Sequence, residues 1–228
     1  DPLPQLCTLD FPRIRQHYLY PEWIDDRLID VIAREDKILK YLDIPLQHCN
    51  DKILKKMNRR GDKKYLCALL DKLRERIPGL VLRTSIIAGL PGEGEEEFDE
   101  LCDFLREQKL LRAGVFPYSP EEGTRAAKME RVDSDEAARR AERIVDIQSE
   151  IIDAWNDERQ GDVMEVLCEG FDGQSMLFVG RSYAESPDID GRIYFSAPRD
   201  VAAGEFVPVR ITGAMDGELT GELAEEEE

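Results

Sequence analysis

The sequence predicts an α/β fold built on a parallel sheet, followed by a small antiparallel β-barrel. Over roughly the first half of the chain, strand-like apolar runs alternate with segments of helical apolar period, the pattern of strand–helix–strand units. After a long polar helix that ends near Gly161, short apolar runs are separated by Gly-rich turns. Short strands at this spacing are typical of a small antiparallel barrel.

The first part of the chain contains four strand-like runs and the helices between them. The strands are expected at residues 13–20, 40–46, 80–90 and 113–119. Longer helices are expected at residues 23–36, 65–79 and 95–108, where apolar residues recur on one face. A further helix is expected to open on Asn50, a residue type that caps helix N-termini.

The second part begins after a helix that is expected to run from Ser134 to Gln160. Acidic residues in its first turn suit the positive end of the helix dipole. Five short strands are expected after it, at residues 163–170, 176–183, 191–196, 206–213 and 219–223. The sequence therefore predicts domains at 1–160 and 161–224, and a solvated acidic tail at 225–228.

Negative charge is concentrated in the second predicted domain. The chain carries a formal net charge of −18, and residues 161–228 contain 16 acidic and 4 basic side chains. Phosphate backbones repel such a surface, so a basic protein is the expected partner and direct nucleic-acid binding is not expected. The alternative is that the charge only keeps the protein in solution.

The remaining composition predicts a cytoplasmic protein. No apolar run is long enough to cross a membrane, and no signal-peptide pattern is present, so no membrane partner is expected. No pair of cysteines has the spacing of metal ligands or of a disulfide framework, so we expect reduced thiols and no metal ligands. The five cysteines are Cys7, Cys49, Cys67, Cys102 and Cys168.

Polar residues cluster at the end of each of the four predicted strands of the sheet. These residues are Tyr18 and Tyr20, Gln47 and His48, Gly89 to Glu93, and Tyr118 and Ser119. Because ligands bind at the carboxyl ends of strands in such folds, we expect a ligand site at this edge. Each of the two histidines, His17 and His48, lies near a strand end. A single histidine at such a position commonly has a structural role, but two at the same predicted edge favour a role in the site.

The turn after the third strand has a backbone that can approach a ligand closely. It contains Gly89, Pro91 and Gly92 and leads into an acidic helix N-terminus. It is not a phosphate loop, because the Lys-Ser/Thr pair is missing. A tight turn with no ligand is the alternative, and the residues alone identify no reaction.

Five segments occur in order along the chain: HYLYPEWIDDRLIDVIA, KYLDIPLQHCNDKILKKMNRRG, LRTSIIAGLPGEGEEEFDEL, GVFPYSPEEGT and VGRSYAESPDIDGRIYFS. They closely resemble the radical S-adenosylmethionine methylthiotransferases, and among them the bacterial branch that modifies an aspartate of small-subunit ribosomal protein twelve. The resemblance implies that residues 1–160 hold the last four strand–helix units of a radical-SAM (β/α) barrel. The second domain would then be a TRAM-like barrel.

The resemblance also implies a reaction and its cofactors. Members of the ribosomal-protein branch use S-adenosylmethionine and two 4Fe–4S clusters to methylthiolate the β-carbon of the target aspartate. This chain has no C-x-x-x-C-x-x-C loop. We therefore expect the ligands of both clusters to lie outside it and the chain to be inactive alone, with its acidic TRAM-like domain binding the basic ribosomal protein.

Five residues are expected to face S-adenosylmethionine if the resemblance holds. The amide of Gln47 would bind a ribose hydroxyl, and Arg83 would neutralise the methionine carboxylate. Gly89, Gly92 and Tyr118 resemble positions that flank the adenosine. For Arg83 the alternative is an ion pair inside the barrel.

Three other interpretations remain open. A sister enzyme methylthiolates adenosine in transfer RNA, but it typically carries QSGS where this chain has QHCN, and its barrel must approach RNA. The chain could instead be a non-catalytic fragment that binds a protein partner. An α/β-barrel lyase without radical chemistry would need catalytic groups that the sequence does not offer.

Overall fold

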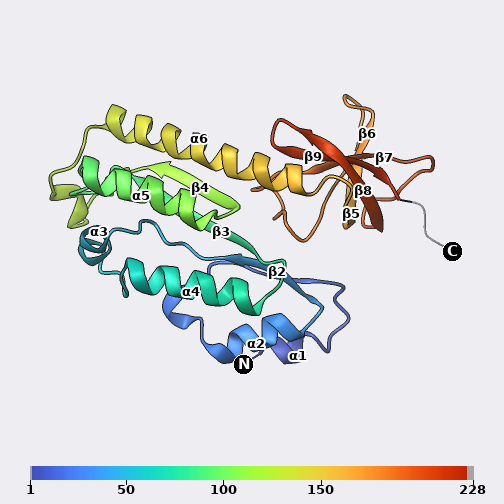
Figure 1. Ribbon diagram of the computed structural model, residues 1–228, viewed down its shortest axis with the longest axis horizontal. Helices are drawn as coiled ribbons and strands as arrows, with labels where there is room; N and C mark the ends of the chain where they lie inside the picture. Colours follow the sequence, from blue (N-terminus) through green and yellow to red (C-terminus); the bar gives the residue numbers. More distant parts are fainter. Residues whose placement is uncertain (1, 225–228) are drawn as a thin grey trace. The chain divides into compact units, whose positions relative to one another are not determined.

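The computed structural model describes residues 2–224, which form two compact units divided between Gln148 and Ser149. This division falls inside helix α6 (Ser134–Glu158), so the domain boundary at residue 160 stays a prediction. The expected acidic tail, residues 225–228, lies outside the described residues. Figure 1 shows the order of the elements along the chain.

The first unit is built on a four-stranded parallel sheet in the order β1-β2-β3-β4. Its strands are β1 (Ile14–Gln16), β2 (Ile38–Asp43), β3 (Val81–Ala88) and β4 (Arg112–Pro117). The predicted α/β fold with a parallel sheet is confirmed, but β1 and β3 are shorter than expected. Tyr18 and Gly89 have left-handed φ angles of 57° and 81°, and this conformation ends an extended strand.

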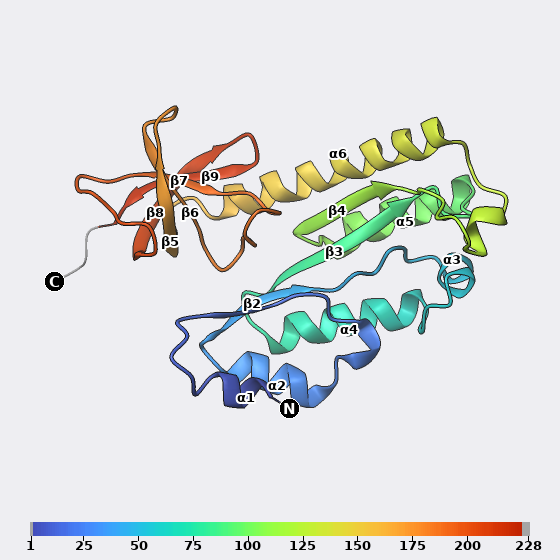
Figure 2. The same ribbon diagram turned by 180° about the vertical axis from the view of Figure 1, so that it is seen from behind.

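Helices pack on one face of this sheet, which Figure 2 shows from behind with β2, β3 and β4 in front of α4 and α5. The helices before α6 are α1 (Leu3–Leu6), α2 (Asp26–Arg34), α3 (Asp51–Lys56), α4 (Lys63–Arg76) and α5 (Glu95–Gln108). Short 3₁₀ helices lie at Pro21–Trp23 and Ala126–Lys128. No helix within residues 2–224 is long and apolar enough to cross a membrane.

Capping side chains fix where the helices begin. Asp25 accepts a hydrogen bond from Leu28 N (2.8 Å), so α2 begins later than the period predicts. Asp62 accepts one from Tyr65 N (2.8 Å), so α4 begins earlier. Asn50 caps α3, as predicted. The apolar side chains buried between sheet and helices include Ile29, Ile32, Leu42, Leu70, Leu73, Ile86, Phe98 and Phe104.

The second unit contains a closed five-stranded barrel in the order β5-β6-β7-β9-β8. Its strands are β5 (Val163–Asp172), β6 (Leu177–Arg181), β7 (Ile193–Ser196), β8 (Phe206–Met215) and β9 (Glu218–Leu223). The barrel is confirmed, although β7 and β9 pair in parallel whereas the other four pairs are antiparallel. Closure also needs small residues, because a Cβ on Gly180 or Gly221 would lie 2.5 Å from a backbone oxygen of the neighbouring strand.

Candidate functional site

Three of the predicted site residues converge on the carboxyl end of β3. Gln47 N donates to Ser85 O (2.8 Å), and Gln47 O accepts from Ile87 N (3.0 Å), so this residue continues the ladder beyond β2. Tyr118 N donates to Ala88 O (2.7 Å), and Gly89 is the next residue of the chain. Main-chain hydrogen bonds therefore gather these positions at one edge of the sheet, as the sequence predicts.

Two of these side chains have unused hydrogen-bonding capacity. The side-chain amide of Gln47 is half-buried and makes no hydrogen bond within the described part of the chain. The Tyr118 hydroxyl is buried and also lacks a partner among residues 2–224. A buried polar group without a partner costs free energy unless a ligand or water satisfies it. Both groups can therefore serve a polar ligand.

Gly89 and Gly92 are needed for contacts within the protein. Both have left-handed φ angles, 81° and 84°. A Cβ on Gly89 would lie 2.6 Å from Ala137 Cβ in α6, and one on Gly92 would lie 1.7 Å from Lys56 Nζ. Other parts of the first unit thus occupy the space next to these two Cα atoms, and a ligand role for either glycine stays a prediction.

Arg83 forms the ion pair that was the alternative to a ligand role. Its Nη1 donates to Asp43 Oδ1 (3.2 Å), and the two side chains are 10 % and 1 % exposed. His17 Nδ1 lies 3.8 Å from Asp43 Oδ2. The two strands bring this pair together, because Asp43 and Arg83 are register partners. That Arg83 also binds a ligand carboxylate therefore stays a prediction.

The other histidine, His48, belongs to a buried cluster behind the turn. His48 Nε2 lies 3.3 Å from Glu93 Oε2, and Glu93 Oε1 accepts a hydrogen bond from Arg140 Nη1 (2.8 Å). Burial alone would raise the pKa of Glu93, but the contacts with His48, Arg140 and Gly89 N outweigh it and hold that pKa below its ordinary value. Glu93 is therefore an anion at neutral pH.

Sequence reasoning missed the parts that Glu93 and Arg140 play in this cluster. Glu93 stands in a run with Glu95, Glu96 and Glu97, and nothing in the sequence distinguishes the one carboxylate that is buried. Arg140 is one of several charged residues on a polar helix. An apolar period identifies the buried face of a helix, but it cannot identify a buried ion pair.

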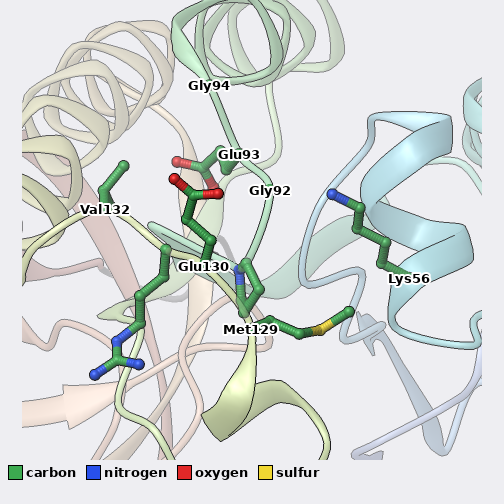
Figure 3. A pocket seen from close by; sticks show the side chains of 9 residues that line it. Lys56, Gly92, Glu93, Gly94, Met129, Glu130 and Val132 are labelled. Carbon is green, nitrogen blue, oxygen red and sulfur yellow. The ribbon is translucent and has the colours of Figure 1, made fainter.

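A cavity of about 520 Å³ lies beside the turn. Figure 3 shows Lys56 of α3 extending toward Gly92, with the segment before α6 on the other side. The charged residues that line the cavity are Lys56, Glu93, Glu130 and Arg131. The side chain of Lys56 makes no hydrogen bond or ion pair within residues 2–224. Charges of both signs at its wall favour a polar occupant over an apolar one.

The cysteines do not form a cluster site in the described residues. All five are free thiols, and Cys49, Cys102 and Cys168 are buried. Burial raises the pKa of the Cys49 thiol far above its ordinary value. No group of three His, Cys, Asp or Glu residues that could hold a metal ion is found between residues 2 and 224.

Comparison with known proteins gives two domain matches and many relatives that align with nearly the whole of this chain. The family model of the Radical SAM superfamily matches residues 10–105, and that of the TRAM domain matches residues 161–224. Ribosomal protein uS12 methylthiotransferase RimO of Symbiobacterium thermophilum is 45% identical over 227 residues, 98% of this chain and 47% of that protein. The RimO of Pelotomaculum thermopropionicum is 47% identical over 212 residues, 92% of this chain and 48% of its own length.

The chain thus spans about half the length of the curated relatives that it matches. Among solved structures, coproporphyrinogen III oxidase (HemN) from Escherichia coli, a radical SAM enzyme, aligns with a TM-score of 0.51. That alignment has 21% identity and covers 61% of this chain and 32% of that one. At this identity it supports the fold alone.

Proposed function

This chain belongs to the radical S-adenosylmethionine methylthiotransferase family, and from that membership we propose that it is the cofactor-binding part of a ribosomal protein uS12 methylthiotransferase. The whole enzyme would methylthiolate the β-carbon of an aspartate in uS12. The observation that carries this proposal is identity of 45% with RimO over almost the whole chain. The family makes the enzyme a transferase.

The residues at the carboxyl end of the sheet fit S-adenosylmethionine. The partnerless Gln47 amide offers both a donor and an acceptor to a ribose hydroxyl, and the buried Tyr118 hydroxyl can pair with a polar atom of the adenosine. Arg83 would hold the methionine carboxylate while Asp43 keeps the guanidinium oriented. When bound, S-adenosylmethionine supplies the radical chemistry and the methyl group of the reaction.

The described residues do not fit an iron–sulfur cluster. Such clusters need several closely spaced thiolates, whereas the five cysteines here are free and three are buried. The family's two 4Fe–4S clusters would therefore be held by the half of the relatives that this chain does not cover. We assign this chain the binding and orientation of S-adenosylmethionine and no reaction of its own.

The barrel of the second unit is the proposed docking domain for uS12. It matches the TRAM family, and residues 161–228 carry 16 acidic and 4 basic side chains. A segment with this charge balance attracts a basic protein and repels RNA. A partner on the ribosome would place the enzyme in the cytoplasm.

Direct binding distinguishes this proposal from modification of transfer RNA. The chain would be titrated with purified uS12 and, separately, with unmodified transfer RNA, at two salt concentrations. The proposal expects uS12 to bind, more weakly at high salt, and transfer RNA not to bind. Binding of transfer RNA without uS12 would favour the sister enzyme, and binding of neither would remove the docking role.

A further inference from the structure

Glu93 lies at the centre of a buried ion cluster that joins three segments of the first unit. The side chains of His48, Glu93 and Arg140 are 0%, 0% and 6% exposed. His48 comes from the segment after β2, Glu93 from the turn after β3, and Arg140 from α6. Ion pairs buried to this degree are costly, because each charge loses its hydration.

The Glu93 carboxylate fixes the conformation of its own turn. Glu93 Oε1 accepts from Gly89 N (2.9 Å) and Oε2 from Leu90 N (3.4 Å), while Glu93 N donates to Leu90 O (2.9 Å). Arg140 Nη1 also donates to Glu93 O (3.2 Å) and Gly94 O (3.3 Å). The carboxylate and the guanidinium together bond both ends of the turn that contains the predicted positions Gly89 and Gly92.

The imidazole of His48 connects that turn to Gln47. His48 Nδ1 accepts a hydrogen bond from Asn50 N (3.0 Å), so the ring proton is on Nε2, which faces Glu93 Oε2 at 3.3 Å. That contact is electrostatic, because it falls outside hydrogen-bond geometry. Gln47 is the residue before His48 and has a left-handed φ of 70°. A shift of the imidazole would therefore move Gln47.

A purely stabilising role explains this arrangement less well. Well-packed apolar residues usually stabilise a core as much as a buried ion pair does. Here the side chains of the cluster bond the main chain of two turns, and both turns carry residues expected to touch the ligand. Catalytic sites need such positions held to within fractions of an ångström.

We propose that His48, Glu93 and Arg140 are positioning residues, which hold the Gln47 segment and the Gly89–Gly92 turn at the separation that S-adenosylmethionine requires. None of the three is assigned a contact with the ligand. This inference rests on the proposed function, because it names the cofactor of the same site.

The test compares Glu93→Gln with wild type by two measurements on the chain as it stands. Calorimetry measures the affinity for S-adenosylmethionine, and hydrogen exchange measures the protection of the Gly89 and Leu90 amides. The substitution keeps the size of the side chain but removes its charge. We expect the affinity to fall by roughly tenfold, as networks that position a site can do, and both amides to exchange faster.

Two control variants separate positioning from stability and from local charge. Ile32→Val lowers the stability of the same unit from a buried site in α2, and Glu96→Gln removes an exposed charge from the first turn of α5. Both should bind S-adenosylmethionine as wild type does. If Glu93→Gln does not fold, Arg140→Lys replaces it in the test. This substitution keeps the positive charge but loses the guanidinium fork, so the variant should bind S-adenosylmethionine more weakly than wild type does.

The outcomes distinguish the two levels of the argument. If wild type binds S-adenosylmethionine and Glu93→Gln binds it equally well, the positioning role is wrong and the proposed function is unaffected. If Ile32→Val weakens binding as much as Glu93→Gln does, the effect is one of stability and the positioning role is again wrong. If wild type itself does not bind the cofactor, the proposed function fails and this inference fails with it.

Discussion

Replacing Gly89 with alanine should destabilise the first unit by about 3 kcal/mol. A left-handed φ costs a residue with a Cβ about 1–2 kcal/mol, and the φ of Gly89 is 81°. The new Cβ would also lie 2.6 Å from Ala137 Cβ and 3.0 Å from Val132 Cγ2, and overpacking of this kind costs typically ~1–3 kcal/mol. In a unit of this size the sum lowers Tm by roughly 6–12 °C.

Native-state hydrogen exchange of the β3 amides is the suitable assay, because it reports the opening of the first unit alone. Gly123→Ala is the matched control. Gly123 has a similar φ of 86°, but nothing lies within 4 Å of its Cβ position, so it incurs only the conformational cost. If Gly89→Ala loses no more protection than Gly123→Ala, the close approach of α6 to the turn is wrong.

Three further predictions concern the barrel, the buried carboxylate and the strand-end ion pair. Gly221→Ala should unfold or open the barrel, because its Cβ would lie 2.5 Å from Arg210 O. In the control, Gly213→Ala, the Cβ would meet only Thr220 Oγ1 at 3.6 Å. Equal melting temperatures for these two variants would contradict the closed barrel. The pKa of Glu93 is lowered on folding, so the stability that this carboxylate gives the first unit is complete above its unfolded pKa near 4.5 and is lost as pH falls through the lower folded value. The free energy of unfolding of Glu93→Gln, measured with denaturant, should therefore depend less on acid pH than that of wild type. Identical pH profiles would count against a charged Glu93. Asp43→Asn should lower the free energy of unfolding by roughly 3 kcal/mol, because it removes the carboxylate from a buried ion pair. Asp26→Asn, on the exposed surface, should lower it far less. Urea titration measures both variants, and equal unfolding midpoints would refute the pairing of Asp43 with Arg83.

The sequence predicts the parts of the fold that local patterns encode. Alternating strand and helix periods predict the parallel sheet, and Asn50 predicts the start of α3 because its side chain bonds the first turn of that helix. The end of β1 was not predictable, since the left-handed φ of Tyr18 has no signature in its neighbours. The parallel pairing of β7 with β9 depends on how the barrel closes, which short strands do not specify.

The site was predictable only where chain order brings residues together. The carboxyl ends of parallel strands share one edge, so Gln47, Gly89 and Tyr118 could be grouped before their contacts were known. The pairing of Asp43 with Arg83 joins residues 40 positions apart, and that of Glu93 with Arg140 joins residues 47 apart. Ion pairs between distant segments depend on strand register and helix packing, which no local pattern records.

Mass spectrometry of ribosomal protein uS12 tests the central claim most directly. The protein would be isolated from the source organism with and without the gene that encodes this chain. The proposed function predicts that the target aspartate peptide carries a methylthio group in the wild type and loses it in the deletion strain, while transfer RNA modification is unchanged. An unaltered uS12 peptide together with loss of a methylthio group from transfer RNA would contradict the proposal and identify the sister enzyme instead.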